Sequence, residues 1–274
     1  MMIKTNIIVA SLIVIFFGIL WFIPIYSLLA GSLKSLQEVM GTPVITPPSN
    51  INLDTALAVA NELKEPILNT IIIVVPTAFM ATFLGTLAAY AIYRKTSKIS
   101  DTLMLLVAIA TYIPYQSILV PLVDIIKKLG LYNTLPGVAL GFLIYFTPMA
   151  ALMMVIFSIA VPKDLIEAAL VDGASELQIF RKVVLPVLGP GIVSTIIFMV
   201  IMIWNNFFIP LILTRGYEKY ITLKIFSYVG QSGTFYNNMF AAALIGSLPP
   251  LIIFILLGRY FIRGLVVLGT GTKG

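Results

Sequence analysis

Long apolar stretches without a single Asp, Glu, Lys or Arg recur along the chain, separated by short polar segments. Six of them reach the ~20 residues that an α-helix needs to cross the hydrocarbon core of a bilayer. They are Thr5–Leu33, Pro66–Tyr93, Thr102–Val123, Leu129–Pro162, Val183–Thr214 and Ile225–Gly258. Within them we predict helices near residues 7–30, 67–93, 103–125, 136–160, 191–213 and 240–262. The pattern therefore predicts an all-α integral membrane protein with six transmembrane helices.

The charges of the loops predict the orientation. Cytoplasmic loops of membrane proteins carry an excess of Lys and Arg, most clearly when the loops are short. With the N-terminus inside, ten of the 17 Lys and Arg residues lie on inner segments and seven on outer ones. The short loop with Arg94, Lys95 and Lys98 is then an inner one. We therefore predict that both termini face the cytoplasm.

The composition narrows the class of protein. Of the 274 residues, 60% are hydrophobic and 10% are charged, and the mean hydropathy is +1.07. A soluble domain carries about 25% charged residues, and disordered chains are poor in apolar residues, so both classes are excluded. The net charge of +6 is expected from basic cytoplasmic loops and does not require nucleic acid as a partner.

Residues that usually carry chemistry are scarce. His and Cys are both absent, which excludes thiolate zinc sites, cysteine nucleophiles and the commonest general base. The predicted spans hold almost none of the ionisable groups that ion-coupled carriers keep in the membrane, and we interpret Asp124 as an interfacial residue. No G-x-x-x-x-G-K-[ST] phosphate-binding loop occurs. We predict a protein that is not an enzyme, binds no cofactor or metal, and takes energy for uphill transport from a partner.

The segment between the fourth and fifth predicted helices carries the densest pattern. Asp164 with Glu167 resembles a helix-capping box, and Gly173 suits the left-handed turn that ends a helix. Ser175 followed by Gln178 repeats the capping pattern. The segment is therefore predicted to hold two short helices around a glycine.

The second of these helices is predicted to end at Leu185-Pro186. On one face it would present Leu177, Phe180, Val183 and Val184. A partnerless amphipathic hairpin at the membrane surface is an equal alternative on physical grounds. A DNA-reading helix-turn-helix is disfavoured, because both flanks are anchored in the membrane and the second helix offers only Arg181 and Lys182 to phosphates.

The spacing of several residues in this segment is similar to a known family signature. Glu167-Ala168-Ala169 is followed after three residues by Gly173, and after nine more by Val183-x-Leu185-Pro186. This spacing resembles the signature of bacterial and archaeal ABC importer permeases. The resemblance implies the type I architecture of that family, with a coupling helix that docks onto a cytoplasmic ATPase. The docking residues that it implies are Glu167, Ala168, Ala169, Asp172, Gly173, Leu185 and Pro186.

Further stretches resemble the carbohydrate branch of that family, the maltose and multiple-sugar type. They are Leu68-Asn69-Thr70-Ile71, Gly130-Leu131-Tyr132-Asn133-Thr134, Asp172-Gly173-Ala174-Ser175, Trp204-Asn205-Asn206-Phe207-Phe208, and Arg263-Gly264-Leu265 with the ending Lys273-Gly274. The chain departs from the family pattern at Asn206, where Asp or Glu is usual, and in Val266–Thr272, where Ala and Gly are more usual.

The resemblance also implies an assembly. The chain would form half of a translocation pathway for a mono- or oligosaccharide, beside a second, homologous permease. Two ATPase subunits would bind ATP and Mg, and an extracytoplasmic solute-binding protein would deliver the sugar. The implied location is the cytoplasmic membrane of a bacterium or archaeon, in contact with lipid.

Two polar groups within the spans are candidates for the substrate pathway. Asn205 and Asn206 lie inside the fifth apolar stretch, where unsatisfied amides are costly; they line the pathway or bond neighbouring helices. Tyr145, Phe146 and Thr147 precede Pro148, where we predict a break in the fourth helix. Amides and aromatic faces suit the hydroxyl groups of a sugar. Gly137 and Gly141 are interpreted as close-packing positions.

The predicted organisation has one membrane core and two extracytoplasmic loops. Its parts are a first transmembrane helix (1–30), a loop (31–66), a core permease domain (67–262) with a coupling loop (161–190) and an outer loop (214–239), and a cytoplasmic tail (263–274). The outer loop is rich in aromatic residues, which anchor chains at membrane interfaces. The resemblance favours contact with the binding protein instead.

Other functions stay open at this point. One alternative is the same architecture with a polyol or a glycerol-phosphate compound as its cargo. An ion-coupled secondary transporter, a membrane-embedded enzyme and a membrane scaffold belong to different classes. The first would transport solute alone under an ion gradient, and the last would tolerate substitutions at Gly173.

Overall fold

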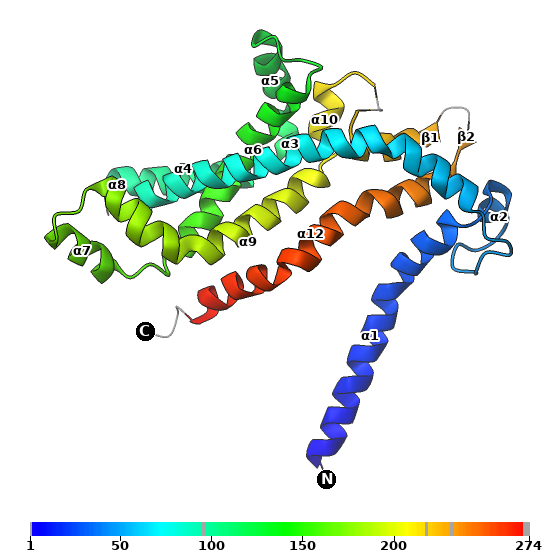
Figure 1. Cartoon of the computed structure of the whole chain (residues 1–274), viewed down its shortest axis with the longest axis horizontal. Helices are drawn as coiled ribbons and strands as arrows, with labels where there is room; N and C mark the ends of the chain where they lie inside the picture. Colours follow the sequence, from blue (N-terminus) through cyan, green and yellow to red (C-terminus); the bar gives the residue numbers. More distant parts are fainter. Residues whose placement is uncertain (1, 95–96, 217–218, 231–232, 271–274) are drawn as a thin grey trace. The chain divides into compact units, whose positions relative to one another are not determined.

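The computed structural model describes residues 2–94, 97–216, 219–230 and 233–270. In this part of the chain every regular element is helical except two strands of two residues each (Figure 1). The chain divides into two compact units. Unit 1 comprises Met1–Ile67 and Tyr217–Leu248, and unit 2 comprises Leu68–Gly216 and Pro249–Gly274. The predicted all-α class is confirmed.

Unit 1 contains the first helix, two loop regions and the beginnings of two long helices. Its elements are α1 (Met2–Ser32), α2 (Leu36–Gly41), the start of α3 (Leu53–Arg94), α11 (Ile221–Ser227), β1 (Val229–Gly230), β2 (Gly233–Thr234) and the start of α12 (Tyr236–Thr270). The strands pair antiparallel, with Val229 opposite Thr234. The predicted outer loop therefore contains a short helix and a minimal hairpin.

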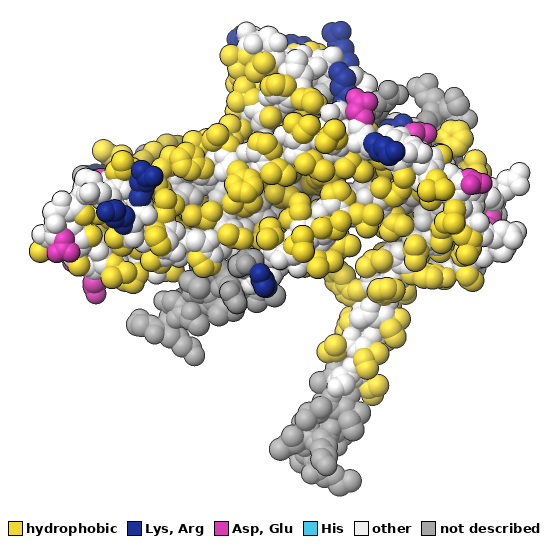
Figure 2. Space-filling view, in the orientation of Figure 1, with side chains coloured by type: hydrophobic (Ala, Val, Ile, Leu, Met, Phe, Trp, Pro, Cys, Tyr) yellow, Lys and Arg dark blue, Asp and Glu magenta, His cyan; other side chains and the backbone are white. Residues whose placement is uncertain are grey.

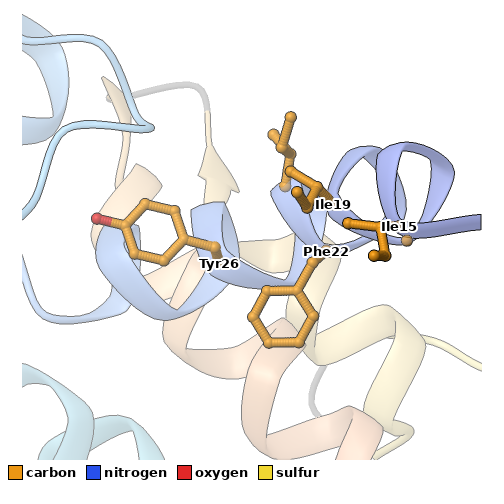
Figure 3. A pocket seen from close by; sticks show the side chains of 6 residues that line it. Ile15, Ile19, Phe22 and Tyr26 are labelled. Atoms are coloured by element: carbon orange, nitrogen blue, oxygen red, sulfur yellow. The ribbon is translucent and has the colours of Figure 1, made fainter. Parts of the chain in front are cut away.

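The first helix of unit 1 is apolar on all sides. Residues 11–25 are all exposed, and Trp21 retains 79% of its accessible surface. A shallow hollow of about 430 Å³ along the helix is lined by Ile15, Gly18, Ile19, Phe22, Ile23 and Tyr26 (Figure 3). A helix that is hydrophobic all round belongs in lipid or against other apolar helices, so α1 fits the predicted first span.

Lys34 organises the loop between α1 and α3. Its side chain is fully buried, and its ammonium group donates hydrogen bonds to Thr42 Oγ1 at 3.1 Å, the Pro43 carbonyl at 3.0 Å and Thr46 Oγ1 at 2.8 Å. The three donors of a lysine are thus matched by three oxygens. We call these four residues the lysine cage. It folds the proline-rich loop around a single side chain.

A second polar cluster fixes α11 to the start of α3. Glu62 Oε2 accepts hydrogen bonds from Lys224 Nζ and from the Tyr228 hydroxyl, each at 2.8 Å. Burial raises the pKa of the Tyr228 hydroxyl, and the neighbouring Glu62 raises it further. Burial likewise raises the pKa of Tyr220, whose side chain is fully enclosed. Two tyrosines of the predicted outer loop therefore pack inside unit 1.

Unit 2 is a helical bundle around α6. Its elements are α4 (Lys98–Tyr112), α5 (Tyr115–Lys128), α6 (Leu135–Ser158), α7 (Lys163–Val171), α8 (Glu176–Ile179), a π-helical turn (Phe180–Val184), α9 (Leu185–Trp204) and α10 (Phe208–Leu213), together with the later parts of α3 and α12. The central α6 packs against α4, α5, α9 and α10. Figure 1 shows α4, α6 and α9 side by side.

Five helices in the described part of the chain are long and apolar enough to cross a membrane, and α4 with α5 forms a sixth span if the bent pair is counted as one. The prediction of a single third helix over 103–125 is wrong, because the pair bends by 100°. Ile113 adopts an extended backbone, with φ −62° and ψ 125°. Pro114 follows it, and a proline both lacks the amide hydrogen and disfavours a helical residue before itself.

Several helix ends differ from those predicted. The second span is a single helix of 42 residues, which includes residues predicted as loop. The fifth helix ends at Trp204 and is followed by the separate α10, where one helix over 191–213 was predicted. The helix α12 continues to Thr270, so most of the predicted tail is helical. Lys273 and Gly274 lie outside the described residues.

The predicted break at Pro148 is also wrong. The helix α6 runs without interruption from Leu135 to Ser158, with Pro148 inside it. The Thr147 hydroxyl donates a 2.6 Å hydrogen bond to the Leu143 carbonyl, one turn earlier. Membrane helices tolerate proline where hydroxyl side chains and neighbouring helices compensate the backbone. A single missing amide is therefore insufficient to break this helix.

Small residues allow close approach around α6. A Cβ at Gly141 would lie 2.5 Å from Leu213 Cδ1, and one at Gly85 would lie 2.7 Å from the Ala150 backbone. The predicted packing role of Gly141 is confirmed. Gly137 faces the Leu131 carbonyl in the preceding loop instead of another helix. These contacts fix the helices that carry the segment described next.

Candidate functional site

The segment from residue 161 to residue 180, which we call the docking segment, contains α7 and α8. The helix α7 starts at Lys163, and its N-cap position is occupied by Pro162, which makes no side-chain cap hydrogen bond. Asp164 therefore lies in the first helical turn, where its carboxylate faces the positive end of the helix dipole. The predicted capping box of Asp164 and Glu167 is wrong, because Pro162 starts the helix earlier than expected.

The end of α7 follows the prediction. Gly173 has φ +79°, its amide donates to the Leu170 carbonyl at 3.0 Å, and the Ala174 amide donates to the Ala169 carbonyl at 2.9 Å. These two bonds form a Schellman motif, which requires a left-handed residue. A Cβ at Gly173 would meet nothing within 4 Å. The backbone conformation, and not a lack of space, is therefore what requires glycine here.

The next helix starts as predicted and ends differently. The Ser175 side chain accepts from the Gln178 amide, and the Gln178 side chain accepts from the Ser175 amide, so a capping box is present. However, Leu185-Pro186 does not end the helix, because α8 continues through the π-helical turn into α9. In that turn the Leu185 amide bonds the Phe180 carbonyl. Pro186 then occupies the first turn of α9, where a proline is tolerated.

The docking segment divides into an inward and an outward face. Ile166, Ile179 and Phe180 are buried in an apolar cluster with α3, α6 and α9. The predicted residues Glu167, Ala168, Asp172, Gly173 and Pro186 are exposed, whereas Ala169 and Leu185 are half-buried. Four large apolar side chains also face outward, namely Leu165, Leu170, Val171 and Leu177, with Val171 retaining 88% of its surface.

Figure 2 shows charged side chains of both signs over α7 and α8, beside the mostly hydrophobic surface of the neighbouring helices. In the structure as described, the outward face of the docking segment thus combines carboxylates, small residues and large apolar groups. Exposed apolar groups of this kind, surrounded by polar ones, are typical of surfaces that bind another protein.

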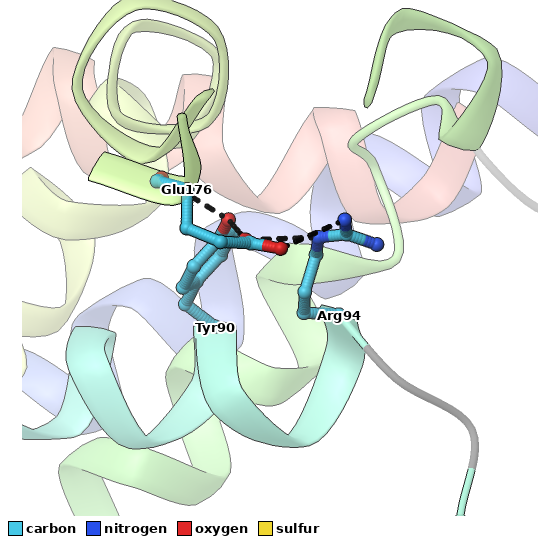
Figure 4. Close-up of polar contacts among 3 residues, drawn as sticks. All are labelled: Tyr90, Arg94 and Glu176. Atoms are coloured by element: carbon cyan, nitrogen blue, oxygen red, sulfur yellow. Dashed lines mark hydrogen bonds and ion pairs between the residues drawn. The ribbon is translucent and has the colours of Figure 1, made fainter. Parts of the chain in front are cut away.

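Sequence reasoning missed a polar cluster at the base of the docking segment. Glu176 forms a fork with Arg94 at the end of α3, with Oε1 2.9 Å from Nη2 and Oε2 3.1 Å from Nε (Figure 4). The Tyr90 hydroxyl donates to Glu176 Oε2 at 2.7 Å. We call these three residues the Glu176 clamp. The partners are more than 80 positions apart in the chain, so no local pattern indicates the pairing.

A small polar cavity lies beside the clamp. It has a volume of about 190 Å³ and is lined by Tyr93, Arg94, Lys163, Ile166 and Glu167. The Lys163 ammonium lies 5.8 Å from the centre of the Tyr93 ring. Glu167 is the only predicted docking residue among those that line this cavity. It lies near two cations without forming an ion pair within 4.0 Å among the described residues.

The two asparagines of the fifth span lie where α9 ends. Asn205 is the C-cap of α9 and is exposed, and its side-chain amide donates to the Ile201 carbonyl at 2.9 Å. Asn206 Oδ1 accepts from the Ile209 amide at 3.1 Å, at the start of α10. Both side chains therefore satisfy backbone groups at a break between helices. This role at the helix break differs from both predicted roles.

The aromatic candidates in α6 differ in exposure. Phe146 is buried, with 1% of its surface accessible, and its ring lies 4.8 Å from that of Tyr145. Tyr145 and Thr147 are half-buried. Phe146 is therefore a packing residue in this structure, which leaves Tyr145 as the better candidate of the two rings.

A second candidate surface lies in unit 1. An apolar groove of about 390 Å³ is lined by Val39, Met40, Val44, Tyr236, Met239 and Phe240. Phe235 and Tyr236 are exposed, unlike the buried Tyr220 and Tyr228. Tyr217, another aromatic residue of the predicted outer loop, lies outside the described residues.

A protein-family model described as "Binding-protein-dependent transport system inner membrane component" matches residues 81–267. This range covers more than half of the chain and includes the whole docking segment. The chain belongs to this family. It is therefore an ABC importer permease, a multi-pass protein of the cell membrane and not an enzyme, since ATP hydrolysis in this family is performed by a separate subunit.

Individual relatives extend over nearly the full length of the permease. It is 44% identical over 265 residues to the glucose import system permease protein GlcU of Saccharolobus solfataricus, covering 94% of this chain and 92% of that protein. It is 30% identical over 284 residues to the arabinooligosaccharides transport system permease protein AraQ of Halalkalibacterium halodurans, covering 99% of both.

The fold also matches a solved structure. A crystal structure of a bacterial ABC transporter involved in the import of the acidic polysaccharide alginate contains a chain that superimposes with a TM-score of 0.77. The match covers 94% of this chain and 97% of that one, at 20% sequence identity. The permease therefore shares the type I importer fold that the resemblance implied.

The residues described contain no group of three or more His, Cys, Asp or Glu side chains that would hold a metal ion. The polar groups described above are amides, hydroxyls, a buried lysine and two ion pairs. Such groups bind and orient neutral polar molecules and partner proteins.

Proposed function

We propose that the permease forms half of a sugar pathway in an ATP-driven importer. The relatives named above import glucose and arabinooligosaccharides, and the high identity to the glucose permease favours a sugar of similar kind. The companion in the pathway is a second, homologous permease, and ATP and Mg are bound by two ATPase subunits. A solute-binding protein delivers the sugar from the extracytoplasmic side, and the termini face the cytoplasm.

The docking segment is the contact that joins the permease to the ATPase in this proposal. The observation that carries it is the outward face of α7, where Glu167, Asp172 and Gly173 are exposed beside large apolar side chains. Leu165, Leu170, Val171 and Leu177 keep between 42% and 88% of their surface accessible. A partner that buries them gains roughly 25 cal/mol for each Å² of apolar surface. Ala169 and Leu185 act from the inner face, by holding the segment to the helices below.

Asn205 is the better of the two asparagines for the substrate pathway. Its side chain is exposed at the end of α9, whereas Asn206 Oδ1 is used by the Ile209 amide. Tyr145 and Thr147 complete the proposed lining, with a ring face and a hydroxyl suited to a sugar. The apolar groove around Met40 and Phe240 is the proposed contact for the solute-binding protein.

Reconstitution tests this proposal. The permease is co-expressed with its companion and ATPase subunits, placed in liposomes with ATP inside, and supplied with binding protein and labelled glucose outside. Uptake that requires ATP, the ATPase and the binding protein is expected. Competition by unlabelled sugars, polyols and glycerol phosphate then identifies the cargo class. Uptake by the permease alone under a proton or sodium gradient would establish a secondary transporter and refute the proposal.

A further inference from the structure

The last turn of α3 holds both ends of the docking segment. At its beginning, the Tyr93 hydroxyl donates a 2.9 Å hydrogen bond to the Val161 carbonyl, and Lys163 lies against the Tyr93 ring. At its end, Arg94 and Tyr90 hold Glu176 in the clamp. All of these contacts lie within unit 2. Two separate points of the docking segment are thus bonded to the same end of α3.

The clamp is extended by an aromatic contact. The Tyr90 ring lies 5.0 Å from the Phe180 ring at an interplanar angle of 49°, and Phe180 belongs to the buried cluster that continues into α9. Tyr90 therefore contacts the carboxylate at the start of α8 with its hydroxyl and the π-helical turn with its ring. Between the two attachment points, Ile166 is the buried residue of α7.

The clamp fixes the direction of the Glu176 carboxylate. The Glu176 side chain is 54% exposed and that of Arg94 is 17% exposed, so one partner of the pair lies mostly inside the fold and the other at its surface. Two parallel bonds from a planar guanidinium fix the direction of a carboxylate, which a lysine does not do. The phenol hydroxyl fixes the third direction. The arrangement is suited to hold an orientation.

We infer that the Glu176 clamp is a mechanical joint that makes the docking segment and the end of α3 move together when the ATPase pulls or pushes the segment. This inference rests on the proposed function of the segment. The continuous helix through the π-helical turn connects the same segment to α9. A displacement of α7 is therefore passed to two membrane helices, to α9 through the backbone and to α3 through the clamp. Arg94, Glu176 and Tyr90 are positioning residues in this mechanism.

Charge exchange tests the joint. Arg94→Glu and Glu176→Arg each place like charges together, and the double variant restores the pair in reverse. In the reconstituted complex, each single variant is expected to bind the ATPase normally while the amount of sugar transported per ATP hydrolysed falls about fivefold or more. The double variant is expected to recover that ratio. Lys98→Gln, an exposed cation outside the segment, is the matched control and keeps the wild-type ratio.

The outcomes separate the inference from the function on which it rests. Failure of the wild-type permease to co-purify with its ATPase would refute the docking proposal itself. Normal ATPase binding with an unchanged transport ratio in both single variants would overturn only the joint. Loss in the single variants without recovery in the double variant would also overturn it, because individual contributions of the side chains would then explain the effect.

A covalent bridge provides a second measurement. The natural chain contains no cysteine, so Arg94→Cys with Glu176→Cys creates one unique pair, which a short reducible bifunctional thiol reagent joins before assembly. If the joint stays closed through the cycle, the bridged permease transports sugar better than the unbridged double variant. If bridging abolishes transport and reduction of the linker restores it, the two elements must separate during the cycle and the inference is wrong.

Discussion

The lysine cage of unit 1 and the docking segment of unit 2 are held in place in opposite ways. Both are irregular, polar connections between long apolar helices. In the cage, a buried cation finds three acceptors within its own loop, so its hydrogen bonds are satisfied without a partner. The docking segment is held at its ends and exposes Leu165, Val171 and Leu177 between them. The difference is that the cage holds its loop from the centre, whereas the docking segment is held at its ends and leaves its middle exposed.

Replacing Lys34 gives the largest expected effect on stability. Lys34→Met leaves the acceptors at Thr42, Pro43 and Thr46 without their donor, and hydrogen bonds to charged groups contribute about 1.5–3 kcal/mol each. We expect a loss of about 3 kcal/mol or more in the free energy of unfolding, measured by thermal unfolding in detergent and by protease cleavage of the loop. Lys64→Met, at an exposed position, is the control. Equal unfolding temperatures for the two variants would show that the cage does not fold the loop.

Charge reversal at Glu167 gives the largest effect on partner binding. A like-charge contact in an interface costs several kcal/mol, so Glu167→Lys should lower ATPase association about tenfold or more. The side chain is exposed, but the new ammonium group would share a cavity with Arg94 and Lys163, so a small fall in the unfolding temperature is expected. Co-purification of the ATPase and sugar uptake measure the effect, and Glu65→Lys is the exposed control in α3. Wild-type uptake by Glu167→Lys would remove this residue from the docking surface.

A substitution at Gly173 tests whether the docking segment needs the left-handed backbone conformation at this position. At φ +79°, a residue with a Cβ is strained by about 1–2 kcal/mol, although the surrounding space is open. Gly173→Val should therefore shift the end of α7 and reduce coupled uptake, whereas Gly173→Asn, which tolerates this conformation, should keep most of it. Membrane insertion of both variants is expected to be normal. Equal uptake by the two variants would argue against a conformational requirement.

Variants of the two asparagines distinguish a substrate contact from a capping role at the helix break. Asn206→Ala removes the acceptor of the Ile209 amide and should cost about 1 kcal/mol of stability, with Asn206→Asp retaining it. Asn205→Ala should leave stability nearly unchanged and alter the concentration of sugar at half-maximal uptake. Uptake curves with several sugars and thermal unfolding distinguish the two effects. Unchanged uptake curves for Asn205→Ala would remove it from the pathway.

Local patterns predicted the parts of this fold that local forces determine. The apolar runs identified the spans, and Gly173 and the Ser175–Gln178 box were found because each signal lies within a few residues. Asp164 failed as a cap because the backbone of the neighbouring Pro162 starts the helix. Pro114 and Pro148 look alike in sequence, yet only the first breaks a helix, since tertiary packing and Thr147 support the second.

Contacts between distant residues were outside the reach of such patterns. Lys34 resembles any loop lysine, and Arg94 resembles any cytoplasmic end of a span, until the fold brings their partners close. The Glu176 clamp joins residues more than 80 positions apart. A pattern in a single sequence does not indicate which distant residues the fold brings together. The docking residues, in contrast, were indicated by a family resemblance, and their role as ATPase contacts stays a prediction.

Tyr228 gives the smallest expected effect and tests the polar cluster of unit 1 through pH. Tyr228→Phe removes one hydrogen bond to Glu62 and should cost about 0.5–1.5 kcal/mol near neutral pH. Folding raises the pKa of this hydroxyl above its ordinary value of 10.0. The hydroxyl therefore contributes fully to the free energy of unfolding below pH 10, and this contribution is lost as the pH rises further. The wild type should therefore lose stability faster than Tyr228→Phe above pH 10. Parallel alkaline unfolding curves would show that Tyr228 remains exposed to solvent and that α11 is not fixed by this contact.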